Sequence, residues 1–154
     1  MEEFSLNFSN LKVDQLGFVF KDIEKQAKIM MEVFGLPKFI FGQPVTNTIQ
    51  FRGMDSQITS QLAFSQMKGT QIELIKWIDG ECSYKEFLDK GKEGLHHIAT
   101  YIEDTELYLK EFSNQGIKVL QAGEILYTRF NYMDTEEKFG IIIELLEKIK
   151  RRKK

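Results

Sequence analysis

The pattern of hydrophobic and polar residues predicts short strands and amphipathic helices in an order that occurs twice. The first strand is expected within residues 11–20, where apolar residues alternate with polar or small ones in the period of two typical of a half-buried strand. Gln15 and Gly17 share one face of this strand. The same face recurs 82 residues later, where His97 and Ala99 stand in their places. The chain therefore reads as an internal duplication, in which each copy opens with a polar residue inside an apolar strand.

An amphipathic helix is expected after each of these two strands. Asp22 is a suitable N-cap for the first helix, Gly35 stands where a C-terminal glycine is expected, and Pro37 prevents continuation. Asp104 is the corresponding N-cap of the second helix, which is expected to end near Gly116. The apolar face of the first helix is expected to pack in the core and consists of Ile23, Ala27, Met30, Met31 and Phe34.

Further strands complete each copy, and a short helix is expected between the copies. Ser83 to Glu86 has the form of a capping box, which predicts the start of that helix. The remaining strands are expected at residues 39–41, 46–51, 57–66 and 70–77 of the first copy, and at 117–120, 125–133 and 139–146 of the second.

These patterns predict an α+β fold in which two tandem βαβββ modules, related by a pseudo-twofold axis, form one cleft. We expect a single domain over residues 1–154. Its parts are a first module at about 11–78, a linker helix at about 80–91, a second module at about 92–147 and a solvated basic tail at 148–154.

Composition narrows the setting of the protein but not its chemistry. With 154 residues, of which 42% are hydrophobic, the chain can bury one core. A net charge of −2 gives no bias toward nucleic acid or membrane. The one cysteine, Cys82, excludes an intramolecular disulfide, and no apolar run approaches the roughly 20 residues of a membrane span. We expect a cytoplasmic protein that binds neither nucleic acid nor membrane.

Each copy also closes with a carboxylate inside an apolar strand, namely Glu73 and Glu144. Burying an unpaired carboxylate costs several kcal/mol, so both residues need a compensating cation or donor. If the copies pair about a pseudo-twofold axis, both carboxylates can meet Gln15 and His97 in one cleft. One imidazole nitrogen with three oxygens suits a divalent metal ion such as Zn, Ni, Co, Mn or Mg. The alternative is that these polar residues are structural.

Two small residues and a second histidine complete this expectation. Gly17 and Ala99 are expected to leave open space for a substrate beside the metal ion. His96 is expected to point to the opposite face of its strand and to serve in packing or hydrogen bonding.

Three sequence strings carry a resemblance to a known family. Gln71 to Leu74, Gly94 to Ala99 and Ile143 to Leu145 stand in the order and spacing of the vicinal-oxygen-chelate superfamily. That superfamily includes glyoxalase I, methylmalonyl-CoA epimerase, extradiol dioxygenases and bleomycin-resistance proteins. The resemblance covers about residues 11–147 and is closest to the epimerase-like branch. It implies metal ligands at Gln15, Glu73, His97 and Glu144.

The resemblance implies a metal-dependent isomerase, epimerase or lyase that abstracts a proton next to a carbonyl or thioester. Glu144 or Glu73 would act as the base. It also implies a small-molecule substrate, such as an acyl-CoA or another thioester, and a homodimer. Arg129 and Arg52, the arginines outside the tail, are candidates for binding a carboxylate or a phosphate of the substrate.

The sequence departs from the family at positions that decide the reaction. The epimerase pattern has His where Gln15 stands, and Gln57 lies near the place of a second catalytic Glu. Glyoxalase I has an Asn shortly after its first-copy ligand, where Ile75 to Trp77 stand here. Two alternatives therefore stay open. One is a non-catalytic, bleomycin-resistance-like binding protein, and the other is a metal site that only joins the two modules.

Overall fold

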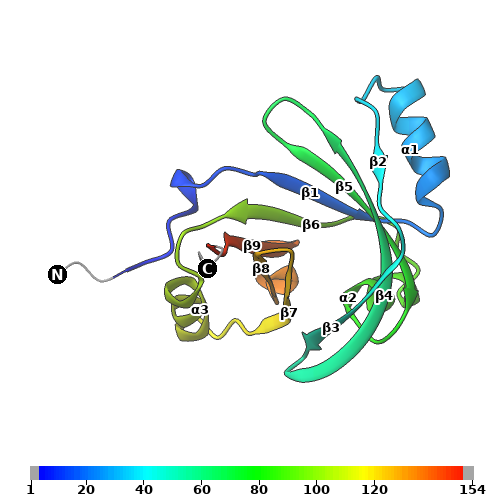
Figure 1. Cartoon of the computed structure of the whole chain (residues 1–154). Coiled ribbons are helices and arrows are strands. Elements are labelled where there is room, and N and C mark those ends of the chain that lie inside the picture. Colours follow the sequence, from blue (N-terminus) through cyan, green and yellow to red (C-terminus); the bar gives the residue numbers. More distant parts are fainter. Residues whose placement is uncertain (1–3, 151–154) are drawn as a thin grey trace.

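The computed structural model describes residues 4–150 of the chain, and Figure 1 shows its course. Residues 1–3 and the final residues of the predicted basic tail, 151–154, lie outside the described part. Within the described part, no helix is both long and apolar enough to cross a membrane. The elements are η1 (Phe8–Asn10), β1 (Gln15–Val19), α1 (Ile23–Glu32), β2 (Ile40–Phe41), β3 (Val45–Phe51), β4 (Met54–Gln66), β5 (Gln71–Asp79), α2 (Ser83–Asp89), β6 (Gly94–Tyr101), α3 (Thr105–Asn114), β7 (Val119–Ile125), β8 (Thr128–Met133), α4 (Glu136–Phe139) and β9 (Ile142–Lys148).

The nine strands of residues 4–150 form one strongly curved sheet, visible in Figure 1. Their order is β2-β4-β3-β7-β8-β9-β6-β1-β5, and β5 also pairs with β4. All strands except β2 therefore form a closed ring around a common interior. The predicted α+β fold with one strand-walled cleft is confirmed.

The two halves of the ring repeat the same arrangement of strands. In the first half β1 lies parallel to β5, and in the second β6 lies parallel to β9. The two opening strands, β1 and β6, are antiparallel neighbours and join the two halves. Because β1 and β6 run antiparallel, the two halves are related by an approximate twofold rotation. The exact module boundaries stay a prediction.

Two helices cover the outside of the sheet and explain the Ile-Glu-Leu strings. Ile72 and Leu74 of β5 face outward and pack in a buried cluster with Ile23 and Ala27 of α1. The corresponding residues of β9 pack in a cluster with α3, whose buried contact is Phe112. Since side chains alternate along a strand, the glutamate between each aliphatic pair must point into the ring. The fold thus places Glu73 and Glu144 in the interior.

Four local predictions need correction. The strand expected at 125–133 contains the turn between β7 and β8, which begins at residue 126. Phe34 was expected in the buried face of the first helix, but α1 ends at Glu32 and Phe34 is 71% exposed. The linker helix α2 forms as predicted, but its N-cap is Cys82 rather than Ser83, and no side chain caps it. The last strand was expected from residue 139, whereas residues 136–139 form the short helix α4 and β9 begins at Ile142.

Candidate functional site

The ring brings the four predicted ligand residues to one point. The Nε2 atom of His97 lies 3.3 Å from Oε1 of Gln15, 3.4 Å from Oε1 of Glu73 and 3.3 Å from Oε1 of Glu144. Each residue comes from a different strand: β1, β5, β6 and β9. Two of the four residues therefore belong to each half of the duplication, as the sequence predicted.

The sheet register explains why these side chains meet. Gly17 of β1 lies between Glu73 of β5 and His97 of β6, as the cross-strand neighbour of both. In the next row, Ala99 of β6 lies between Gln15 of β1 and Glu144 of β9. The central residue of each row is small, so the polar side chains on either side can lean toward one another.

Gly17 does not leave the open space that was expected for a substrate. A Cβ atom at this position would overlap the imidazole ring of His97. The imidazole ring therefore occupies the space above Gly17, and the missing side chain is what allows His97 to lie over β1. The prediction of a substrate-sized gap at Gly17 was wrong, and the position instead controls where the imidazole lies.

The electrostatics of the site follow from its burial. His97 is 0% exposed and Glu144 is 5% exposed. Burial lowers the pKa of His97, but the charges and hydrogen bonds of Glu144 and Glu73 raise it more, to about 9. Burial also raises the pKa of Glu144, and the neighbouring imidazolium only partly offsets this effect. Without a metal ion, a proton on Nε2 of His97 is what holds the carboxylates together.

A β-bulge at His96 breaks the expected alternation of the two histidines. Gly17 pairs with His97 and Phe18 pairs with Leu95, so His96 is an extra residue in β6. Its ring packs against the rings of Tyr84, Phe87 and Tyr132, and its Nδ1 atom lies 3.0 Å from Nδ1 of His97. The packing and hydrogen-bonding role predicted for His96 is observed, but His96 contacts the site residue directly instead of facing away from it.

The contact between the histidines favours one tautomer of His97. Burial lowers the pKa of His96 well below its usual value, so this ring is neutral. When His97 carries a proton on Nδ1, it can donate to Nδ1 of His96, and Nε2 is the nitrogen that can give up its proton and bind a metal ion. Histidines that bind metal ions commonly donate their other N–H in this way. His96 thus prepares the nitrogen that a metal ion would need.

The donor set fits a divalent metal ion in both chemistry and spacing. Ligand atoms around one such ion, with bonds of about 2.0–2.2 Å, lie roughly 3 to 3.5 Å apart, and the three distances from His97 fall in this range. No group of three or more His, Cys, Asp or Glu side chains within residues 4–150 is preformed to hold a metal ion. The site residues contact one another instead, and the fourth donor is an amide oxygen. The metal centre remains a prediction.

The site opens into a cleft of about 260 Å³ inside the ring. Gln15, Glu73 and Glu144 lie in its wall, while His97 lies behind them and is fully buried. Most of the remaining wall is aliphatic or aromatic and comes from β3, β4, β7, β8 and β9 and from the β7–β8 turn. Its apolar residues are Ile49, Ile58, Leu62, Phe64, Ile125, Leu126, Phe130 and Leu146.

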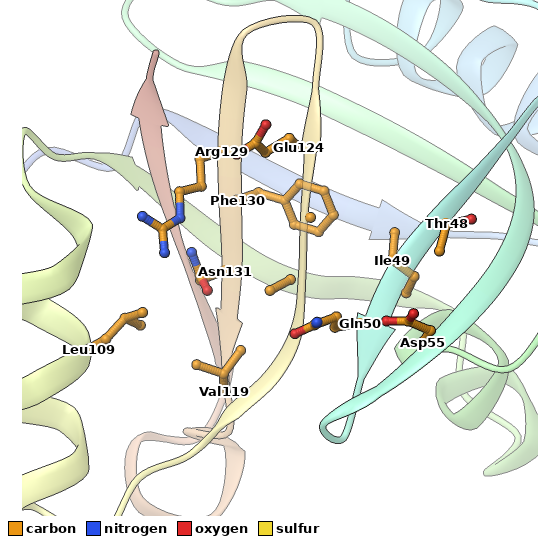
Figure 2. Close-up of a pocket in the computed structure, with 12 residues that line it drawn as sticks. Thr48, Ile49, Gln50, Asp55, Leu109, Val119, Glu124, Arg129, Phe130 and Asn131 are labelled. Atoms are coloured by element: carbon orange, nitrogen blue, oxygen red, sulfur yellow. The ribbon is translucent and has the colours of Figure 1, made fainter.

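Neither arginine proposed from the sequence lines this cleft. Arg52 lies in the β3–β4 turn and donates two hydrogen bonds to Glu86 of α2, at 2.9 and 3.2 Å. Arg129 lies on β8 and pairs with Glu106 at 2.6 Å. Figure 2 shows Arg129 beside Asn131 in a separate hollow of about 490 Å³, which lies over the seam between β3 and β7.

Sequence reasoning did not single out Tyr84 and Gln121 as residues of the cleft, and it favoured core packing over a place in the cleft for Tyr132. The hydroxyls of Tyr84 and Tyr132 lie 2.7 Å apart in the wall. Gln121 accepts a hydrogen bond from the Ser83 amide at 2.9 Å, while its Nε2 atom is buried without a partner among residues 4–150. Gln121, Tyr132 and Glu144 are successive cross-strand neighbours. Strand pairing created this row, and no spacing in the sequence could have revealed it.

Comparison with known proteins gives a family and a fold. A family model described as the glyoxalase/bleomycin resistance protein/dioxygenase superfamily matches residues 14–131. No curated protein matches the chain. Among solved structures, a methylmalonyl-CoA epimerase from Mycobacterium tuberculosis is 21% identical, covers 97% of this chain and 94% of its own, and has a TM-score of 0.65.

Two further structures are similar to about the same degree. A hypothetical protein from Bacillus halodurans is 18% identical, with 94% of this chain and 99% of that chain covered and a TM-score of 0.67. A variant of the Streptomyces coelicolor methylmalonyl-CoA epimerase, in complex with 2-nitronate-propionyl-CoA, is 15% identical, with coverages of 93% and 98% and a TM-score of 0.67. At such identities the similarity shows the fold alone.

Proposed function

The chain belongs to the glyoxalase/bleomycin resistance protein/dioxygenase superfamily, and from this premise we propose that it is a metal-dependent enzyme that removes a proton next to a carbonyl or thioester. The family resemblance found in the sequence is thereby confirmed. The observation that carries the proposal is the convergence of two carboxylates and one amide oxygen on Nε2 of His97, within 3.4 Å.

The four residues would hold one divalent ion through one nitrogen and three oxygens. A bound ion would supply Lewis-acid polarisation of the substrate carbonyl, which acidifies the neighbouring carbon–hydrogen bond. The protein supplies the rest of the site. His96 orients His97, and the tyrosine pair and the apolar wall restrict access of water to the carboxylates.

Glu144 is the better candidate for the base. Burial raises its pKa, and a general base works best when its pKa lies nearer the operating pH. Glu73 comes from the other half of the duplication, and its strand β5 and strand β9 of Glu144 lie on opposite sides of the β6–β1 pair. One carboxylate could therefore take a proton from one face of the substrate while the other returns it to the opposite face. This arrangement suits epimerisation or isomerisation.

The proposed function also includes a substrate class, an oligomeric state and a cellular setting. Two similar structures are named as methylmalonyl-CoA epimerases, which supports an acyl-CoA or another thioester as the substrate class. The proposal includes a homodimer and a cytoplasmic setting, as predicted from the sequence. Its alternative is a binding protein that performs no chemistry, which the intact set of four polar residues disfavours.

Metal content and proton exchange test the proposal together. Protein purified without chelator is expected to hold about one equivalent of a divalent metal ion. The His97→Ala and Glu144→Ala variants are expected to lose it. Glu103→Ala is the matched control, because Glu103 is an exposed glutamate outside the cleft.

Metal-loaded wild type should then exchange the α-proton of a suitable thioester in deuterated water, and the two site variants should not. Wild-type protein that neither holds nor takes up a divalent metal ion would contradict the enzyme proposal and favour the binding alternative. A metal ion that is held but exchanges no bound water would favour a purely structural site.

A further inference from the structure

The charges of the cleft wall restrict what can bind in it. Among the described residues that line the cleft, Glu73 and Glu144 are the only carboxylic acids, and none is Lys, Arg or His. One divalent ion would balance these two carboxylates. A single negative group on the ligand could then bind at the ion, but a second one would lie in an apolar wall without a cation.

Among residues 4–150, the cations near the cleft are already paired or lie outside it. Arg129 is paired with Glu106, and Arg52 is paired with Glu86. Lys148 lies over the ring of Tyr101 at the rim, 5.2 Å from the ring centroid, and is itself exposed. The separate hollow beside Arg129 also contains Asp55 and Glu124, so it offers no excess of positive charge (Figure 2).

The size of the cleft sets a second limit. A volume of about 260 Å³ is slightly smaller than the roughly 300–1,000 Å³ of typical small-molecule pockets. The adenosine part of a CoA ester would not fit beside its acyl group. Only the reacting end of a larger substrate can therefore enter, and the remainder must pass the rim near Tyr101 and Leu126.

We propose that the part of the substrate inside the cleft is small, apolar and uncharged apart from at most one anionic group, which lies at the chelating end. Suitable chemistry is a 2-oxo acid, a malonyl-type half-thioester or a hydroxyketone with an aliphatic or aromatic remainder. The inference deepens the proposed function. It rests on that function only for the chelating end, because the apolar wall is independent of any metal ion.

Two dyes that differ in one charged group can test, in the metal-free protein, whether the cleft wall disfavours an anion. N-phenyl-1-naphthylamine is neutral, and 1-anilinonaphthalene-8-sulfonate carries an added sulfonate; both fluoresce when they enter an apolar site. We expect the neutral dye to bind the metal-free protein at least about tenfold more tightly, because a buried anion without a partner costs several kcal/mol. Equal affinity, preference for the sulfonate, or binding of neither dye would overturn the inference.

Two 2-oxo acids of matched shape test the same property at the metal-loaded site. With Zn²⁺ present, 5-methyl-2-oxohexanoate should bind at least about tenfold more tightly than 2-oxoglutarate, in which a carboxylate replaces the terminal isopropyl group. If the dyes discriminate as expected but neither 2-oxo acid binds, the wall is as inferred and the proposed metal chemistry fails. If 2-oxoglutarate binds more tightly, the substrate inference fails while the metal site stands.

A charge placed in the wall should reverse the preference. Ser60 lines the cleft and is half-buried, so Ser60→Lys can place an ammonium group there, and Ser60→Met is the uncharged control of similar length. In Ser60→Lys the ratio of the two dye affinities should shift by at least about tenfold toward the sulfonate, and in Ser60→Met it should stay within about threefold. Folding of both variants is checked by circular dichroism, and an unchanged ratio in a folded Ser60→Lys protein would contradict the inference.

Discussion

Gln15 donates a hydrogen bond from its Nε2 atom to Oε1 of Gln71, at 2.8 Å. The two residues are direct cross-strand neighbours in the parallel pair β1–β5. The bond decides which end of the Gln15 amide faces the site, because the nitrogen is engaged and the oxygen is left toward His97. Gln15 stands where the family pattern has a histidine, so Gln71 is what allows an amide to present an acceptor there.

Gln71 should therefore control metal affinity without touching the metal ion. We expect Gln71→Met to weaken binding of Zn²⁺ by about ten- to hundredfold, the usual effect of losing a residue that orients a ligand. Competition with a chromophoric chelator measures the dissociation constant. Gln66→Met is the control, because Gln66 is an exposed cross-strand neighbour of Gln71 outside the site.

Repeating the measurement in a Gln15→Glu background shows whether Gln71 orients the residue 15 side chain or only supports the fold. A carboxylate presents an acceptor from either end, so Gln15→Glu needs no orienting partner. In that background Gln71→Met should change the affinity less than about threefold. An equal loss in both backgrounds would mean that Gln71 only supports the fold.

The close approach of Gly17 and His97 predicts a large effect of a single methyl group. Gly17→Ala would place its Cβ in the imidazole ring, and we expect the free energy of unfolding to fall by about 1–3 kcal/mol. In a His97→Ala background, Gly17→Ala should lower the free energy of unfolding little further, because the overlapping ring is already gone. Gly42→Ala is the control, since its Cβ would meet only the Leu62 carbonyl oxygen, at 3.5 Å. Chemical denaturation of the wild type, the three single variants and the double variant measures the effect, and a Gly17→Ala protein of wild-type stability would refute the geometry.

The stability of the metal-free protein should depend on pH through His97. Burial lowers the pKa of this residue, but Glu144 and Glu73 raise it more, from 6.5 to about 9. A raised pKa in the folded state means that the stabilisation is fully present below the unfolded value of 6.5 and is lost as the pH rises through 9. The free energy of unfolding should thus fall by up to about 3 kcal/mol between about pH 6 and pH 10. The decrease should be absent in His97→Gln, and a wild-type protein whose stability is constant over this range would contradict the assignment.

The ion pair of Arg129 and Glu106 predicts that the arginine is dispensable for chemistry. Arg129→Ala should leave metal affinity and proton exchange within about twofold of the wild type, because the side chain lies outside the cleft. Its effect on stability should stay below about 1 kcal/mol, as for other solvent-exposed pairs. Thermal denaturation and the deuterium-exchange rate measure both quantities. A tenfold loss of exchange would instead support the substrate role predicted from the sequence.

The sequence by itself determined the repeated α+β pattern and the residues that converge. The alternation of Ile72, Glu73 and Leu74 requires the glutamate to face away from the covering helix, and the same holds at Glu144. The duplication placed Gln15 and His97 in corresponding positions. These features follow from periodicity along one strand, which is a local property of the chain.

The tertiary structure alone decided which atoms face one another across strands. The bulge that brings His96 against His97, the ring of His97 over Gly17 and the bond from Gln15 to Gln71 all depend on the register of paired strands. The row from Gln121 through Tyr132 to Glu144 joins three strands and has the same origin. Register is set by packing of the whole sheet, and a shift of one residue reverses every side chain. For this reason the sequence identified the metal-binding candidates, while their supporting residues and the otherwise uncharged wall of the cleft became visible only in the folded chain.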